Sequence, residues 1–136
     1  MSETLEAQLI RHEGLRLDMY KCPADEWTIG VGHNLSRPIS KKAALVILGD
    51  DIDDCRTDLY RLLSDEITEL PAPAVQVLLN MCFNLGITRL RRFKKMLAAI
   101  RSSQWDLAAD ELLDSAYARQ VGQRAVELSE MLRKLA

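Results

Sequence analysis

The sequence lacks a charge excess, a cysteine framework and a long apolar run. Its 136 residues carry a formal net charge of -2, so no overall electrostatic attraction to nucleic acid is expected. The three cysteines, Cys22, Cys55 and Cys82, are an odd number without a CxxC pair. This spacing indicates neither a disulfide framework nor a zinc site, and we expect no metal ion or other cofactor.

The amino terminus also lacks the basic and apolar segments of a secretory signal. Residues 1–6 are acidic, so we expect synthesis in the cytoplasm and no stable membrane insertion. The composition, 48% hydrophobic and 28% charged residues, is that of a globular protein. The length fits a single domain over residues 1–136 with a core of its own, and we expect a monomer.

One local basic cluster departs from this balance. It is formed by Arg89, Arg91, Arg92, Lys94 and Lys95. A binding site for a polyanion is one interpretation of such a cluster. A solvated helix start, balanced by acidic residues elsewhere, is the interpretation we favour.

Helical periodicity dominates the chain. A cap at Ser2 or Thr4 predicts a helix that ends before Gly14, and Ser40 predicts a long helix over 41–63, with Gly49 as a point of kinking or division. Alternating apolar residues between Leu17 and Val31 predict a small hairpin or meander. A central buried helix should follow Pro73 and end at Gly86, and shorter helical patterns cover 93–100, 105–113 and 121–135. The expected class is α+β, mainly α.

Two small lobes are the expected arrangement within this domain. The sheet-bearing amino-terminal lobe should cover about residues 13–48. The helical lobe should cover about residues 64–136 together with the amino-terminal helix, and the long helix should lead from one lobe to the other.

The segment from Glu13 to His33 combines residues suited to acid catalysis. Glu13 lies at the end of the first helical pattern, and the hairpin turns Thr28 back toward it. Hydrolysis of a glycosidic bond needs a carboxyl that protonates the leaving oxygen and a second group that acts on water or stabilises the oxocarbenium ion. Glu13 is a candidate for the first role, although a glutamate at a helix end is often only a surface charge.

The wider pattern resembles the phage-type lysozymes, glycoside hydrolase family 24. The resemblance lies in Glu13-Gly14-Leu15-Arg16-Leu17, Tyr20, Trp27-Thr28-Ile29-Gly30-Val31-Gly32-His33, Asn80-Met81-Cys82-Phe83-Asn84-Leu85-Gly86, Gln104-Trp105-Asp106 and residues 120–124. It implies a two-lobed lysozyme fold with a cleft. It also implies an inverting muramidase that cleaves the β-1,4 bond between N-acetylmuramic acid and N-acetylglucosamine in bacterial peptidoglycan. The implied setting is an endolysin released from the host cytoplasm to the cell wall through a holin.

The resemblance makes Glu13 the general acid and Thr28 the residue that positions water. At the second catalytic position this chain has Cys22, where family members commonly have Asp. An ordinary thiol, with a pKa of about 8.5, is mostly neutral at pH 7. Cys22 therefore replaces Asp, or Asp25 or Asp18 supplies the carboxylate, or the chain is a catalytically weakened module that binds a glycan or a protein. Chitin is an alternative substrate.

The resemblance assigns further residues to substrate and to structure. Arg124 pairs with Glu13 across the cleft, and Asn84 faces the sugar. Glu26 lies beside the hairpin, where the saccharide runs. His33 is expected to pair with Asp51 as a structural contact. Packing roles are expected for Cys55, Cys82, Tyr117 and Asn80.

Overall fold

The computed structural model describes residues 2–136. The chain divides into two compact units, an amino-terminal unit that ends at Ala44 and a carboxy-terminal unit over Leu45–Ala136. Helices predominate, and the only sheet among the described residues has three strands. The expected α+β, mainly α class is confirmed, whereas the expected limits of the lobes stay a prediction.

Helix α1 (Leu5–Glu13) opens the amino-terminal unit. The hydroxyl of Thr4 accepts a hydrogen bond from the amide of Ala7 at 3.1 Å and so caps a free amide of the first turn. Gly14 ends the helix with a φ of 80°, a conformation that favours glycine. Both ends lie where the sequence predicts them, and Glu13 is the last helical residue.

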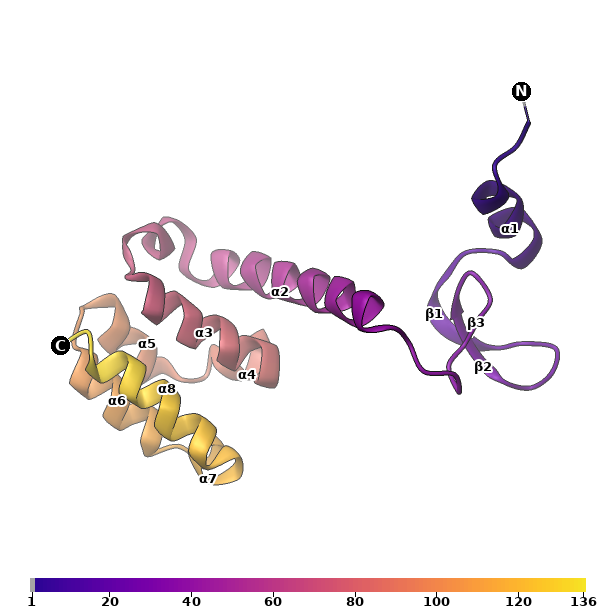
Figure 1. Cartoon of the computed structure of the whole chain (residues 1–136). Helices are drawn as coiled ribbons and strands as arrows, with labels where there is room; N and C mark the ends of the chain where they lie inside the picture. The colour runs from indigo at the N-terminus through magenta and orange to yellow at the C-terminus, as the bar shows by residue number, and fades with distance from the viewer. Residues whose placement is uncertain (1) are drawn as a thin grey trace. The chain divides into compact units, whose positions relative to one another are not determined.

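The sheet follows as an antiparallel meander of β1 (Arg16–Lys21), β2 (Trp27–Gly30) and β3 (His33–Asn34), shown in Figure 1. Tyr20 lies opposite Thr28, and Thr28 lies opposite Asn34. A bulge between Arg16 and Tyr20 shifts the register of β1. Because side chains alternate between the faces of a strand, Tyr20, Thr28 and Asn34 share one face.

Helix α2 (Lys41–Leu63) is continuous over 23 residues. The hydroxyl of Ser40 accepts from the amide of Ala43 at 3.0 Å, which confirms the predicted cap. Gly49 lies within the helix and does not divide it, because a lone glycine weakens a helix without removing a backbone hydrogen bond. Cys55, Leu59 and Leu63 are the buried residues of α2.

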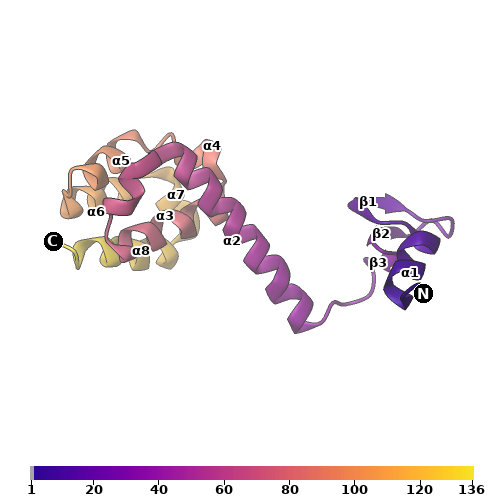
Figure 2. The same ribbon diagram turned by 90° about the horizontal axis from the view of Figure 1, so that it is seen from above.

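Six helices and one 3-10 segment complete the described chain. They are η1 (Ser64–Glu69), α3 (Ala72–Leu85), α4 (Ile87–Leu90), α5 (Lys94–Arg101), α6 (Trp105–Leu113), α7 (Ala116–Val121) and α8 (Gln123–Arg133). Figure 2 shows the helices α3 to α8 gathered at one end of α2. The sequence pattern predicts neither η1, α4 nor α7. The helix expected over 121–135 is shorter than predicted, because Gly122, with a φ of 59°, separates α7 from α8.

The hydrophobic core lies in the carboxy-terminal unit, where α6 packs against α5 and α8, and α3 packs against α8. Helix α3 buries Ala74, Val77, Leu78, Met81 and Cys82 as expected, but Phe83 is 47% exposed. Cys55 and Tyr117 are buried too. Tyr117 meets Phe93 edge to face, with ring centroids 6.1 Å apart. The predicted packing roles of Cys55, Cys82 and Tyr117 are in accord with this burial.

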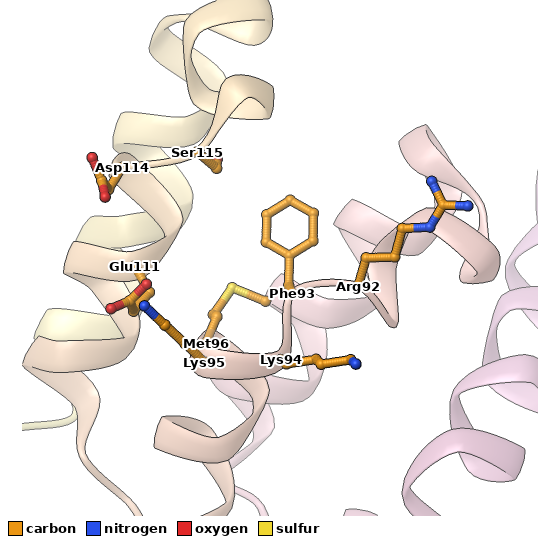
Figure 3. Close-up of a pocket in the computed structure, with 8 residues that line it drawn as sticks. All are labelled: Arg92, Phe93, Lys94, Lys95, Met96, Glu111, Asp114 and Ser115. Carbon is orange, nitrogen blue, oxygen red and sulfur yellow. The ribbon is translucent and has the colours of Figure 1, made fainter.

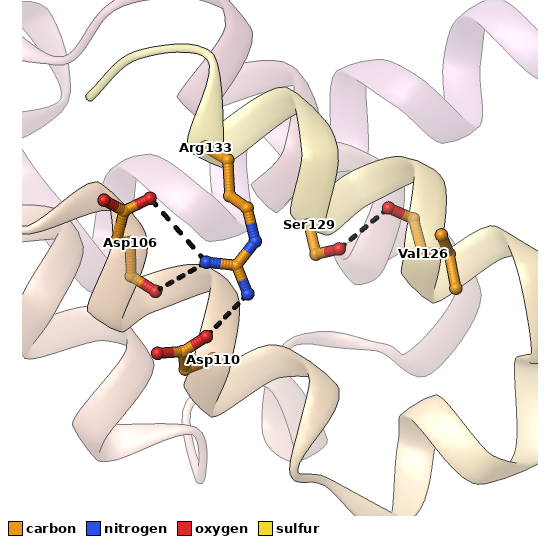
Figure 4. A network of polar contacts seen from close by, with 5 residues as sticks. All are labelled: Asp106, Asp110, Val126, Ser129 and Arg133. Atoms are coloured by element: carbon orange, nitrogen blue, oxygen red, sulfur yellow. Dashed lines mark hydrogen bonds and ion pairs between the residues drawn. The ribbon is translucent and has the colours of Figure 1, made fainter.

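An ion-pair network joins the last helix to α6. A guanidinium nitrogen of Arg133 lies 2.5 Å from Oδ1 of Asp110, and another lies 3.6 Å from Oδ1 of Asp106 (Figure 4). On the same helix, Ser129 donates to the carbonyl of Val126 at 2.8 Å. Since the three charged side chains are partly exposed, this network adds more to the orientation of α8 than to stability.

No helix among residues 2–136 is both long and apolar enough to cross a lipid bilayer.

Candidate functional site

Glu13 lies against the turn that joins β2 to β3. A Cβ atom at Gly32 would come within 3.1 Å of Oε2 of Glu13 and within 3.4 Å of its Cδ. Gly32 also has a φ of 66°, which favours glycine. The carboxyl of Glu13 therefore approaches the glycine turn more closely than a larger residue would allow, while the residue as a whole remains exposed.

Thr28 is the one buried residue among those described in the amino-terminal unit, with 4% of its surface exposed. Its hydroxyl donates to the carbonyl of Glu26 at 2.9 Å. This bond fixes the side chain toward the turn between β1 and β2. Thr28 can hold a polar ligand only through the lone pairs of its oxygen or by giving up this bond.

Cys22 lies at the start of that turn, directly across from Glu26. The amide of Cys22 donates to the carbonyl of Glu26 at 2.9 Å, and the amide of Asp25 donates to the carbonyl of Cys22 at 2.8 Å. The pKa of the Cys22 thiol is lowered, chiefly because the backbone amide of Glu26 hydrogen-bonds to the sulfur, with smaller contributions from the amide of Ala24 and the side chain of Thr28. Partial burial and the Glu26 charge act in the opposite direction.

Cys22 and Thr28 therefore lie close together on one face of the sheet. The resemblance assigns both residues to the catalytic site, and the strand register explains why they lie together in this unit. Lys21 pairs with Trp27, so the next pair along the hairpin is Cys22 with Glu26. By alternation, Glu26 and Thr28 extend from the same face of β2.

Glu26 has a polar network that the sequence analysis missed. Its Oε2 accepts a hydrogen bond from Nδ2 of Asn34. Oδ1 of Asn34 in turn accepts from the amide of Ser36 at 2.9 Å and from its hydroxyl at 2.8 Å. The sequence shows only a polar residue at 34 after the Gly-Val-Gly turn, because the pairing of Asn34 with Thr28 depends on the strand register.

Asp25 and Asp18 are the alternative carboxylates for the second catalytic position, and their side chains have different surroundings from Cys22. Asp25 has a left-handed φ of 61°, and its side chain, 88% exposed, lies 3.6 Å from Nζ of Lys21. Lys21 itself lies over the ring of Trp27, at 4.9 Å from its centroid. Asp18 is an exposed residue within the bulged part of β1. Among the described residues, neither the Asp25 nor the Asp18 carboxylate forms a hydrogen bond with Cys22 or Thr28, although the backbone amide of Asp25 donates to the carbonyl of Cys22.

Arg124 and Asn80 form a contact within the carboxy-terminal unit. Nε of Arg124 donates to Oδ1 of Asn80 at 2.9 Å, and a terminal nitrogen donates to the carbonyl of Asn80 at 3.2 Å. Both residues line a hollow of about 310 Å³ together with Gln76 and Phe83. Asn84 is exposed one helical turn after Asn80. Glu13 and Arg124 belong to different units, so their expected pairing stays a prediction.

His33 has a buried Nε2 without a hydrogen-bond partner among the described residues. Buried polar atoms in folded proteins usually form at least one hydrogen bond. The expected partner, Asp51, is exposed on α2 and belongs to the other unit. The pairing of His33 with Asp51 therefore stays a prediction.

The basic cluster of the sequence lies around α4 and the start of α5. Arg92, Lys94 and Lys95 line a hollow of about 400 Å³ that Glu111 and Asp114 also line (Figure 3). The acidic side chains interrupt the positive charge on this side of the unit. This arrangement favours the solvated helix start over a site for a polyanion.

No group of three or more His, Cys, Asp or Glu side chains within residues 2–136 is arranged to hold a metal ion.

Comparison with known proteins gives matches along nearly the whole chain. The family described as Phage lysozyme matches residues 10–136. A Dictyostelium discoideum protein named Probable T4-type lysozyme 2 is 27% identical over 154 aligned positions, which cover 92% of this chain and 91% of that protein. Probable T4-type lysozyme 1 of the same organism is 25% identical with the same coverage. An Endolysin of Acyrthosiphon pisum secondary endosymbiont phage 1 is 33% identical over 82 positions, 57% of this chain and 54% of that protein.

Proposed function

The chain belongs to the phage lysozyme family, and from this premise we propose that it is a muramidase. The substrate is bacterial peptidoglycan, and the bond cleaved is the β-1,4 bond between N-acetylmuramic acid and N-acetylglucosamine. Two relatives are named T4-type lysozymes and a third is named an endolysin, which supports this class of reaction. We further propose that the protein acts as a monomeric endolysin that reaches the cell wall through a holin.

The observation that carries the proposal is the arrangement of Glu13, Cys22 and Thr28 in one unit. Glu13 lies at the end of a capped helix, with its carboxyl against Gly32. Cys22 and Thr28 meet on one face of the sheet, next to the turn. A purely structural module has no need for a carboxyl, a thiol with a lowered pKa and a threonine hydroxyl gathered in this way.

Glu13 is the general acid of this mechanism. Its proton goes to the glycosidic oxygen as the bond to the anomeric carbon breaks. Thr28 and Cys22 act on the other side, where a water molecule attacks the same carbon. Attack from the opposite face gives inversion of configuration.

Residues of the carboxy-terminal unit complete the substrate site in this proposal. Arg124, held by Asn80, offers guanidinium donors to Glu13 or to an anionic group of the glycan. Asn84 is an exposed amide that can hydrogen-bond to sugar hydroxyls.

Substitution of Glu13 tests the proposal. We expect Glu13→Gln to reduce the clearing of permeabilised Gram-negative cells, or of purified peptidoglycan, by at least about 100-fold, because it removes the proton donor and preserves shape. Glu6→Gln on the same helix is the matched control and should clear at the rate of the unaltered protein. Full activity of Glu13→Gln would remove Glu13 from the mechanism.

The test also separates the proposal from its rival, a lysozyme-like binding module. Pelleting with purified sacculi measures binding, and release of reducing sugar measures cleavage. Binding without cleavage by the unaltered protein would favour the module. Cleavage of chitin at a rate equal to that of peptidoglycan would replace the muramidase by a chitinase.

A further inference from the structure

We propose that Glu26 is a catalytic residue, whose carboxylate takes the proton of the attacking water beside Cys22. This inference rests on the proposed muramidase activity. It identifies a carboxylate that can act as the general base, because this chain has Cys22 where family members commonly have Asp. The sequence places Glu26 only along the path of the saccharide.

The backbone of Glu26 is fixed from two sides. Its carbonyl accepts from the amide of Cys22 and from the hydroxyl of Thr28, each at 2.9 Å. These bonds hold Glu26 at the end of the hairpin, between the two residues that the mechanism assigns to water. Because Glu26 and Thr28 are two positions apart on one strand, their side chains leave the same face.

The carboxylate of Glu26 is also oriented. Nδ2 of Asn34 donates to Oε2, and two donors from Ser36 fix the other end of the Asn34 amide. An exposed glutamate on a strand would otherwise rotate freely, at a cost in entropy whenever it must take one geometry. The hydrogen bonds from Asn34 to Glu26 and from Ser36 to Asn34 hold the Glu26 carboxylate in one orientation before substrate binds. Oε1 remains available to accept a proton.

The thiol of Cys22 and the carboxylate of Glu26 are close enough to influence each other. The negative charge of Glu26 opposes ionisation of Cys22 and so acts to raise its pKa. An ordinary carboxyl is ionised at neutral pH whereas an ordinary thiol is mostly protonated, so a carboxylate is the group available to accept a proton there.

The other carboxylates near the hairpin have different surroundings. The side chain of Asp25 lies toward Lys21 and is 88% exposed. Asp18 lies in the bulged part of β1, beyond Tyr20, whose ring is covered by the guanidinium of Arg16 at 4.4 Å. Of the three, Glu26 is the carboxylate with an electrostatic effect on Cys22.

An O–H bond of water breaks and its proton passes to Oε1 of Glu26, while the water oxygen forms a bond with the anomeric carbon. The bond from that carbon to the glycosidic oxygen breaks, and Glu13 gives its proton to this leaving oxygen. Thr28 and the thiol of Cys22 hold the water by hydrogen bonds.

Steady-state kinetics on purified peptidoglycan test the role of Glu26. We expect Glu26→Gln to lower kcat by at least about 100-fold with KM changed less than about threefold, because loss of a general base affects the chemical step. Glu6→Gln, the same chemical change on α1, is the matched control and should retain kcat. A rise in KM with an unchanged kcat would overturn the proposal and leave Glu26 as a substrate contact.

The Cys22→Asp background separates a catalytic role from a structural one. With a carboxylate restored at position 22, Glu26→Gln should lower kcat less than about threefold, whereas a structural defect would lower it in both backgrounds. An equal loss in the two backgrounds would therefore overturn the proposal. Inactivity of the unaltered protein would instead defeat the muramidase proposal itself, so the two failures are distinguishable.

Alkylation of Cys22 by iodoacetamide gives a readout independent of turnover. Glu26→Gln should accelerate alkylation of the peptide that contains Cys22 severalfold at pH 7, because removal of a negative charge favours the thiolate. Asp25→Asn should alter the rate less. An unchanged rate in Glu26→Gln would show that the two side chains do not share a site, and would overturn the proposal.

Discussion

The two units of this protein differ in what fixes their side chains. In the carboxy-terminal unit, apolar residues such as Leu78, Met81 and Leu112 are fully buried and packing holds each in place. In the amino-terminal unit, Thr28 is the only buried residue among those described, and apolar residues such as Leu17 are largely exposed. Caps, glycine turns and a polar network set the geometry there. Stability is therefore concentrated in one unit, and the candidate chemistry in the other.

The three thiols give the largest expected contrast between the units. Burial and the neighbouring Cys55 thiol raise the pKa of Cys82 to about 12, whereas the pKa of Cys22 is lowered, chiefly by the Glu26 amide. Because the thiolate is the reactive form, a raised pKa and burial both slow the reaction of Cys82. We expect iodoacetamide at pH 7.5 to label Cys22 far faster than Cys82 in the folded protein, as peptide mass spectrometry can measure.

Labelling in denaturant is the control, since unfolding should make the rates of the three thiols nearly equal. Comparable labelling rates of Cys82 and Cys22 in the folded protein would contradict the proposed contrast between a buried thiol in the carboxy-terminal unit and a reactive thiol in the amino-terminal unit.

Truncation of a core side chain should give the next largest effect. Leu78 is fully buried, so Leu78→Ala should lower the free energy of unfolding by about 2–5 kcal/mol. Met19, 60% exposed on β1, is the matched position in the other unit, and Met19→Ala should change stability by less than about 0.5 kcal/mol. Urea unfolding followed by circular dichroism measures both. A loss for Met19→Ala as large as that for Leu78→Ala would show a second core.

Substitution of two glycines near the sheet should change stability less than Leu78→Ala does and gives the sharpest test of Glu13. Gly30 and Gly32 have φ values of 68° and 66°, so alanine at either should cost about 1–2 kcal/mol. Only at Gly32 would the new Cβ meet Glu13, at 3.1 Å from Oε2. We expect Gly32→Ala to lower kcat at least about tenfold more than Gly30→Ala, because small displacements of a catalytic group are costly.

Thermal unfolding of both glycine variants checks that their stabilities match. Equal activity of the two variants would indicate that the contact between Glu13 and Gly32 has no bearing on catalysis.

Local signals in the sequence were sufficient for the elements that carry caps. Thr4 and Ser40 mark the starts of α1 and α2, and Gly14 and Gly86 mark the ends of α1 and α3. These residues act within a few positions of themselves, through one hydrogen bond or one backbone conformation, so a single sequence contains the information.

Other features depend on contacts that a single sequence does not contain. The break at Gly122 divides a stretch that periodicity alone describes as one helix, and Phe83 is exposed on a helix whose apolar pattern predicts burial on nearly every side. The network from Glu26 through Asn34 to Ser36 depends on strand register. The roles of Glu13, Cys22, Thr28, Glu26, Asn84 and Arg124, and the pairing of His33 with Asp51, stay predictions.

The bond between Arg124 and Asn80 has a consequence for affinity. An unrestrained arginine side chain samples many rotamers, and fixing it costs roughly 2 kcal/mol of entropy. Asn80 accepts from two nitrogens of the guanidinium, so much of that freedom is already lost in the folded protein. An anionic group can bind the remaining donors of Arg124 without first ordering the side chain. The entropy cost of binding is therefore smaller and the affinity higher.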